Sequence, residues 1–288
     1  MKLFILLCNI FIIIFITSCS KSKKEIKVFE LNKNIEFNLD NKDLLNSKEE
    51  IRNILYDFLI QKDIIKYSVN SFQLFTSKYN QILMMIKFKI NFKKIKEEDG
   101  GFIYKIYFTD FELKHKLYYG YFDFELVNKK YNLIMNALYF NIVIDNYGKK
   151  IFDIESKVSF NPSLKSMSGF IFNIINYIFL ELPKSKIVDN NFIFTNKKYE
   201  LTDLKDEDGS ILLKYDNSEK NNIDIEPLKD YLILKSDNKN SKIRILYSKK
   251  DKIPEKINLL FENGDKLKFE DKEYTYSVKN YYFIHKIK

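Results

Sequence analysis

The sequence predicts an α+β protein: a curved antiparallel sheet that meanders around a buried helix, with a second helix flanking the sheet near the N-terminus. Three observations support this fold class. From Ser68 onward, apolar and polar residues alternate over many short stretches, which is typical of half-buried strands. Residues 162–182 are apolar at helical spacing on nearly every side, and residues 51–59 carry an apolar stripe on one side only.

The flanking helix is predicted at about residues 47–66. Ser47 and Glu50 match a capping box, in which two side chains satisfy free amides of the first helical turn. The apolar residues that follow at helical spacing are Ile51, Ile54, Leu55, Phe58 and Leu59. This stripe predicts an amphipathic helix that packs on a sheet.

The strands are predicted where the alternation is regular and turn residues separate the runs. Residues 86–92 and 102–108 alternate, and the sequence EEDGG at residues 97–101 predicts a hairpin turn between them. Further strands are expected at residues 117–127, 131–145, 150–160, 192–195, 198–204, 210–215, 230–236, 239–247, 257–261 and 267–274, with a turn at Asn263-Gly264. Short links between these runs predict antiparallel neighbours in a meander.

The buried helix is predicted at residues 162–182. Asn161 suits the N-cap and Pro162 the first helical position, where a missing amide hydrogen has no cost. Pro183 prevents the helix from continuing. The uninterrupted apolar part is too short to cross a hydrocarbon core of ~30 Å. We interpret the segment as a core helix, or as a helix that plugs or lines an apolar cavity in the sheet.

Apolar residues on both faces of the expected strand at residues 131–145 raise a further question. One helix cannot cover both faces of a sheet this wide. Either a second layer covers the remaining surface, or part of the sheet faces a ligand.

The charge and the motifs argue against nucleic-acid binding and catalysis. The formal net charge is +9, but acidic and basic residues are spread along the chain and match no nucleic-acid-binding signature. The two histidines, His115 and His285, lie in no metal or triad motif, and no phosphate-binding loop is present. We therefore expect neither an enzyme nor a cofactor, a metal site or a nucleic-acid partner.

The N-terminus carries the most specific motif. Residues 1–18 have the positive start and the short apolar run of a secretory signal. Ile16-Thr17-Ser18-Cys19 resembles the bacterial lipobox, which implies diacylglycerol on the Cys19 sulfur, cleavage before Cys19 and acylation, typically with palmitate, of its new amino group. The alternative is an ordinary secretory signal with an incidental cysteine.

This motif divides the chain into a signal peptide at residues 1–18, a lipid anchor and tether at residues 19–40, and one β-rich domain at residues 41–288. Two or three acyl chains would hold the mature protein to a membrane almost irreversibly, since each buried CH₂ contributes about 0.8 kcal/mol. Ser20 is not the aspartate that retains lipoproteins in the inner membrane. The expected location is the bacterial outer membrane, on either its periplasmic or its outer face.

Two segments resemble the LolA/LolB superfamily of lipoprotein carriers and receptors. Residues 173–187, NIINYIFLELPKSKI, are similar to the LolB helix that runs into a proline and then an apolar residue. Residues 243–274 are similar to its C-terminal pattern, with Pro254, Ile257 and Leu259 in the matching places. The resemblance implies an unclosed antiparallel β-barrel capped by helices, with an apolar cavity for the acyl chains of lipoproteins.

The expected function is therefore a lipid-anchored, non-enzymatic envelope protein that binds acyl chains of lipids or lipoproteins, with a possible role in lipoprotein localisation. The candidate lining residues of its cavity are Phe88, Ile90, Phe102, Tyr104, Ile174 and Ile178. The alternative is a surface-exposed lipoprotein that binds a protein partner.

Overall fold

The computed structural model describes most of the predicted β-rich region. The described residues are 28–37, 63–77, 81–98, 101–115, 129, 132–133, 135–136, 139–145, 150–153, 171, 173–180, 191–205, 211–269 and 272–287. Cys19, the expected flanking helix up to residue 62, and most of the expected strands at 117–127 and 150–160 lie outside these residues.

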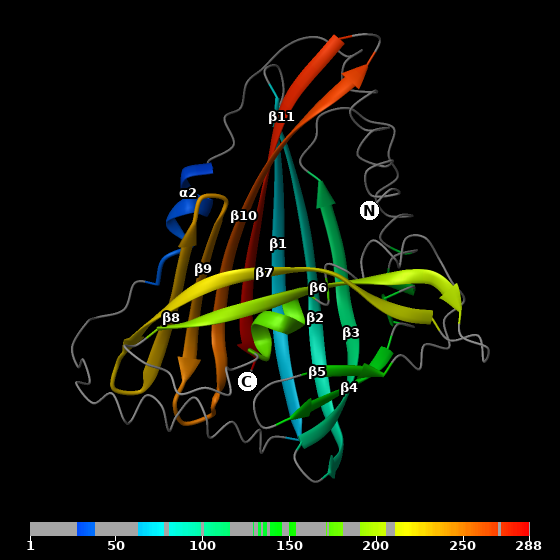
Figure 1. Cartoon of the computed structure of the whole chain (residues 1–288), viewed down its shortest axis with the longest axis vertical. Helices are drawn as coiled ribbons and strands as arrows, with labels where there is room; N and C mark the ends of the chain where they lie inside the picture. The colour runs from blue at the N-terminus through cyan, green and yellow to red at the C-terminus, as the bar shows by residue number, and fades with distance from the viewer. Residues whose placement is uncertain are drawn as a thin grey trace.

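Among the described residues, eleven strands form one antiparallel sheet (Figure 1). They are β1 (Ile64–Ser77), β2 (Gln81–Glu98), β3 (Gly101–His115), β4 (Tyr139–Asp145), β5 (Lys150–Asp153), β6 (Asn191–Lys205), β7 (Ile211–Pro227), β8 (Tyr231–Asn238), β9 (Ser241–Ser248), β10 (Ile253–Phe269) and β11 (Lys272–Ile287). Their spatial order is β5-β4-β3-β2-β1-β11-β10-β9-β8-β7-β6. The predicted antiparallel sheet is confirmed, and it is not closed, because β5 and β6 are both edges.

The sheet consists of two meanders, which are joined where β1 pairs with β11, the first and last of its strands in the chain. In each meander, consecutive strands are neighbours. The pairing of β1 with β11 runs from Lys66 opposite Ile287 to Ser77 opposite Tyr276. The two ends of the described sheet region therefore meet in its middle, and this pairing makes one sheet of two halves.

The sheet is strongly curved. Figure 1 shows β6 and β7 crossing in front of β1, β2 and β3. Ile223 and Ile225 of β7 belong to the same buried cluster as Tyr67 of β1 and Ile90 of β2. Register shifts interrupt the pairing of β2 with β3 and of β10 with β9. Such irregularities bend strands and increase their twist, so they favour this curvature.

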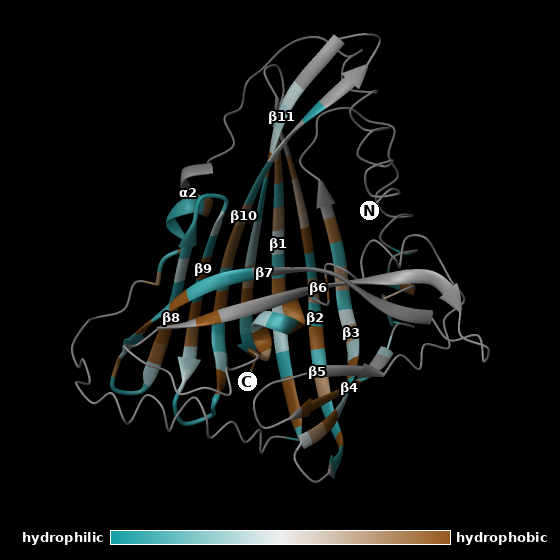
Figure 2. Cartoon of the chain, viewed as in Figure 1, coloured by the Kyte–Doolittle hydropathy of each residue, from teal (hydrophilic) through white to brown (hydrophobic). Residues whose placement is uncertain are grey.

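Residue alternation assigns the two faces of the sheet. Along β1, Ile65, Tyr67 and Val69 are buried on the concave side. Ile64 and Lys66, which alternate with them, are exposed. Figure 2 shows the same alternation of apolar and polar residues on several strands. This pattern follows from the two-residue period of a strand.

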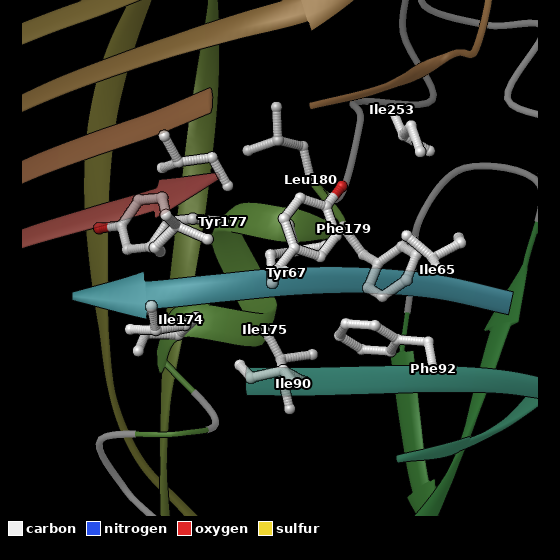
Figure 3. Close-up of a cluster of buried hydrophobic side chains, with 14 of the residues drawn as sticks. Ile65, Tyr67, Ile90, Phe92, Ile174, Ile175, Tyr177, Phe179, Leu180 and Ile253 are labelled. Atoms are coloured by element: carbon white, nitrogen blue, oxygen red, sulfur yellow. The ribbon is translucent and has the colours of Figure 1, made fainter. Parts of the chain in front are cut away.

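The described part of the expected buried helix lies on the concave side. Residues 171 and 173–178 are helical, and every described side chain from Ile174 to Leu180 is buried. Figure 3 shows these side chains against those of β1 and β2. No helix among the described residues is long and apolar enough to cross a membrane.

A short N-terminal segment packs on the other, convex face. It begins with α2 (Val28–Lys33) and continues to residue 37. Ile35 is 2% exposed and packs in a cluster with Leu260, Tyr281 and Phe283. The segment lies within the range expected to be a tether, and it covers apolar positions that would otherwise face solvent.

Three local predictions differ from the structure. Residues 132–133 and 135–136, expected in a strand, are helical, and β4 begins only at Tyr139. The flanking helix was expected to reach residue 66, but β1 already begins at Ile64. Asn263-Gly264 is not a turn: β10 runs through it, and Gly264 pairs with Ser277. A continuous partner strand outweighs the local turn preference of Asn-Gly, because it satisfies the backbone hydrogen bonds.

Candidate functional site

The six candidate lining residues lie in one buried cluster on the concave side. The described residues place Phe88, Ile90, Phe102, Tyr104, Ile174 and Ile178 there, all between 0% and 4% exposed. Two come from β2, two from β3 and two from the helix, so these elements meet in one interior. The convergence follows from the sheet's curvature, which turns alternate residues of distant strands toward one interior.

The helix fills the space in front of these strands. The ring of Phe179 meets the ring of Phe92 edge-on, at 5.0 Å between centroids, and lies 6.1 Å from the ring of Tyr104. Tyr177 lies 6.1 Å from Phe261 of β10. One short segment therefore contacts both halves of the sheet.

The sequence interpretation missed the part of the interior contributed by the C-terminal half. Its members are Ile223, Ile225, Leu232, Leu234, Ile243, Ile245, Tyr247, Ile253, Ile257, Leu259 and Ile284. These residues carry the same two-residue alternation as the N-terminal strands. The alternation identifies the inward face of each strand, but it does not predict which distant strands enclose the same interior.

Two buried tyrosines tie the interior to the turn between β9 and β10. The Tyr67 hydroxyl donates to the Pro254 carbonyl oxygen at 2.8 Å, and the Tyr247 hydroxyl donates to the Lys252 carbonyl oxygen at 2.5 Å. Burial raises the pKa of Tyr67 well above its ordinary value, and the nearby Glu255 carboxylate raises it further. Both hydroxyls therefore act as neutral donors that close this end of the interior.

An ion cluster lies beside these tyrosines. The Lys286 ammonium donates to Asp251 and, at 2.6 Å, to Glu255. The Lys286 side chain is only 13% exposed. Burial works to lower the pKa of Lys286, but the hydrogen bonds to the two carboxylates raise it overall, so the ammonium stays charged. This arrangement ties β11 to the turn at Asp251 and to the start of β10, where Pro254 lies.

The described interior offers apolar contact rather than reactive groups. No group of three His, Cys, Asp or Glu side chains that could hold a metal ion occurs among the described residues. Asn176 is a buried polar residue of the helix, at 2% exposed. His285 lies on β11 opposite Lys256, and the predicted lipid-bearing Cys19 is outside the described residues.

The fold thus defines a mainly antiparallel β-protein with an open, curved sheet and an apolar concave side. No family model and no curated protein match this chain. A DUF1329 family protein from Desulfovibrio piger ATCC 29098 is similar over 83% of this chain and 88% of its own, at 13% sequence identity and a TM-score of 0.18. A TM-score this low does not establish a shared fold.

Proposed function

We propose that this chain is a lipid-anchored, non-enzymatic protein of the bacterial envelope that binds acyl chains on the concave side of its sheet. Its finer architecture is that of an unclosed β-barrel plugged by a helix, similar to the LolA/LolB superfamily. The lipobox supports a lipid on Cys19 and a location at the outer membrane. The proposed partners are the membrane and acyl chains or lipoproteins, and not nucleic acid.

The observation that carries this proposal is the short apolar helix on the concave side. In the chain the helix lies between β5 and β6, the two edge strands of the sheet. Displacing it would break side-chain packing but no pairing between the inner strands. An acyl chain could replace the contacts of Ile174 and Ile178, because methylene groups and isoleucine side chains are both apolar and lose no hydrogen bonds when buried.

The test is a titration of the form that lacks residues before Ser20 with fatty acids of increasing length. Each buried CH₂ contributes roughly 0.8 kcal/mol before losses, so two added methylenes should tighten binding by about tenfold at most. The trend should end abruptly at the length that the interior accepts. Phe102→Asp should weaken binding, whereas Ile95→Asp, at a residue 54% exposed, should not.

Thermal melts of both variants must first establish that the fold survives. Undetectable binding of every chain length by a folded wild-type protein would contradict the acyl-chain proposal.

The anchor is tested separately by Cys19→Ala. This change should abolish incorporation of radiolabelled palmitate, because the other cysteine, Cys8, lies inside the predicted signal peptide and outside the lipobox. Labelled Cys19→Ala protein would contradict the assignment of the lipid to this cysteine.

A protein partner is the second candidate function. Ile64 is 51% exposed and Ile95 is 54% exposed, and they lie near each other, since Ile64 pairs with Lys93 on the neighbouring strand. Two exposed isoleucines on adjacent strands favour a contact surface. Ile64→Ser with Ile95→Ser should then remove specific cross-links formed in intact cells, without lowering the melting temperature.

A further inference from the structure

Three buried polar atoms on β7, β8 and β9 have no hydrogen-bond partner. They are Asn221 Nδ2, Ser236 Oγ and Ser241 Oγ. The three residues are 1%, 3% and 5% exposed, in that order. Since more than about 90% of buried polar groups in proteins are paired, three unpaired ones on neighbouring strands need an explanation.

The three side chains share the concave face at one edge of the apolar interior. Asn238 lies opposite Ser241, and its Nδ2 donates to Asn221 Oδ1 at 2.7 Å, so the three strands are linked in one row. Ser236 lies two residues before Asn238 and therefore on the same face of β8. We call Asn221, Ser236 and Ser241 the rim cluster.

Apolar residues of the interior adjoin the rim cluster. Ile223, Leu234 and Ile243 each follow or precede one of its members by two residues and belong to the main buried cluster. An acyl chain lying on these residues would bring its polar end to the rim cluster. The cluster offers an amide N–H and two hydroxyls, which are groups that can donate to an oxygen atom.

The described ion pairs of this region lie on the other face of the sheet. Lys235 pairs with Glu226, and Arg244 pairs with Asp237, all at positions that alternate with the inward residues. Among the described side chains, these two ion pairs place no cation at the rim cluster, so an anionic head group buried there would be costly. A neutral oxygen acceptor fits the cluster better.

We propose that the rim cluster binds the ester carbonyl of an acylglycerol whose chain lies in the apolar interior. This inference rests on the proposed acyl-chain function and adds the chemical class of the head group. The polar atoms remain unpaired in the ligand-free protein because their partner is the ligand.

Stability provides the first test. In the full chain, kept in solution by an amphipathic polymer, Ser236→Ala and Ser241→Ala should leave the melting temperature unchanged or raise it, because each removes an unpaired buried group. The matched control is Ser248→Ala on the same strand β9. Ser248 is 6% exposed, but its Oγ accepts from the Asp251 amide at 3.1 Å, so this change should lower the melting temperature.

Binding provides the second test, with two probes of equal chain length. A 1-monoacylglycerol carries the ester carbonyl, and the matching 1-O-alkylglycerol lacks it. The full chain should bind the ester about tenfold more tightly than the ether, as one or two net hydrogen bonds would give. The Ser236→Ala/Ser241→Ala variant, which keeps only the Asn221 amide as a donor, should lose most of this preference and should bind the ether as well as wild type does.

Each outcome decides between the proposals. Equal binding of ester and ether by wild type would overturn the rim-cluster assignment and leave the acyl-chain function standing. No binding of either probe would overturn both. A lowered melting temperature for both Ser→Ala variants would mean that the hydroxyls have partners in the protein, and would also overturn the assignment.

Discussion

Arg244 joins segments that are far apart in the chain. It is 5% exposed, and its Nε and Nη2 donate to the Glu36 carboxylate at 2.8 and 2.9 Å. Nη2 also donates to Asp237 at 2.9 Å, and Nη1 donates to the Ile243 carbonyl oxygen at 2.9 Å. Burial works to lower the pKa of Arg244, but the carboxylates raise it overall, so a charged guanidinium holds the N-terminal segment on the convex face.

The two carboxylates around Arg244 should not contribute additively to stability. Glu36→Ala alone should cost about 1 kcal/mol, because Asp237 still pairs with the guanidinium. Adding Asp237→Ala leaves the buried guanidinium without either of these carboxylates, so the double variant should lose about 3–5 kcal/mol. Urea denaturation measures both losses.

Glu262→Ala is a control for these two variants. Glu262 pairs with Lys279, and the two side chains are 43% and 30% exposed, so solvent screens this ion pair. Its cost should stay below about 1 kcal/mol. Strictly additive losses at Glu36 and Asp237 would contradict the shared role.

His285 should make the stability depend on pH. Burial lowers its pKa below the ordinary value of 6.5, and Lys256 on the neighbouring strand lowers it further. The unfolded chain therefore takes up this proton at a higher pH than the folded protein does. The contribution to stability is complete above about pH 6.5 and declines as the pH falls below it.

Thermal melts between about pH 7.5 and pH 5.5 check this prediction. The melting temperature of wild type should fall more over this range than that of His285→Gln, which cannot titrate. Parallel pH profiles for the two proteins would mean that His285 has the same proton affinity in both states.

Among the elements, the helix on the concave side depends most on its surroundings. Residues 174–180 are buried without exception, so packing rather than solvent surrounds the helix. A segment as short as its described part, residues 171 and 173–178, is not stable as a helix alone in water. Its conformation is therefore stabilised by the strands around it.

Ile175→Asp should disrupt this element. Ile175 is 0% exposed, and a carboxylate there has no evident partner, so the change should cost several kcal/mol out of a typical domain stability of about 5–15. Ile193→Asp on β6 is the matched control, because Ile193 is 61% exposed. Thermal melts should differ strongly between the two variants, and equal melts would mean that Ile175 faces solvent.

At the scale of the whole molecule, the β1–β11 pairing makes one cooperative unit of two meanders. The main buried cluster includes residues of both halves and of the helix. Neither meander can retain this interior without the other. The first and last described strands are neighbours, so the fold requires nearly the complete chain of the sheet region.

The protein should therefore unfold in a single transition. Far-ultraviolet circular dichroism and the fluorescence of its 20 tyrosines, in a chain without tryptophan, should give coincident curves in urea. A chain that ends before Lys272 should show no cooperative transition, because β1 and β10 each lose one of their two partner strands and the two meanders are no longer joined. Two separate transitions in the full chain would mean that the meanders fold independently.

Local patterns determined the faces of the elements. Alternation along residues 86–92 and 102–108 correctly identified inward residues, and the EEDGG turn lies where β2 ends and β3 begins. The apolar surface on nearly every side of residues 162–182 predicted burial, and the described residues 174–180 of this range are buried. Each of these features depends on residues within a few positions of one another, so a single stretch of sequence contains the information.

Only the tertiary structure decided how these elements associate. The pairing of β1 with β11 joins residues 199 to 221 positions apart, and many strands of similar pattern compete for such a partner. Pairing with β11 carried β10 through Asn263-Gly264, and Glu36 of the N-terminal segment lies against Arg244 on the convex face. Alternation in a strand indicates that one of its faces is apolar. Which residues cover that face depends on the free energy of the whole fold.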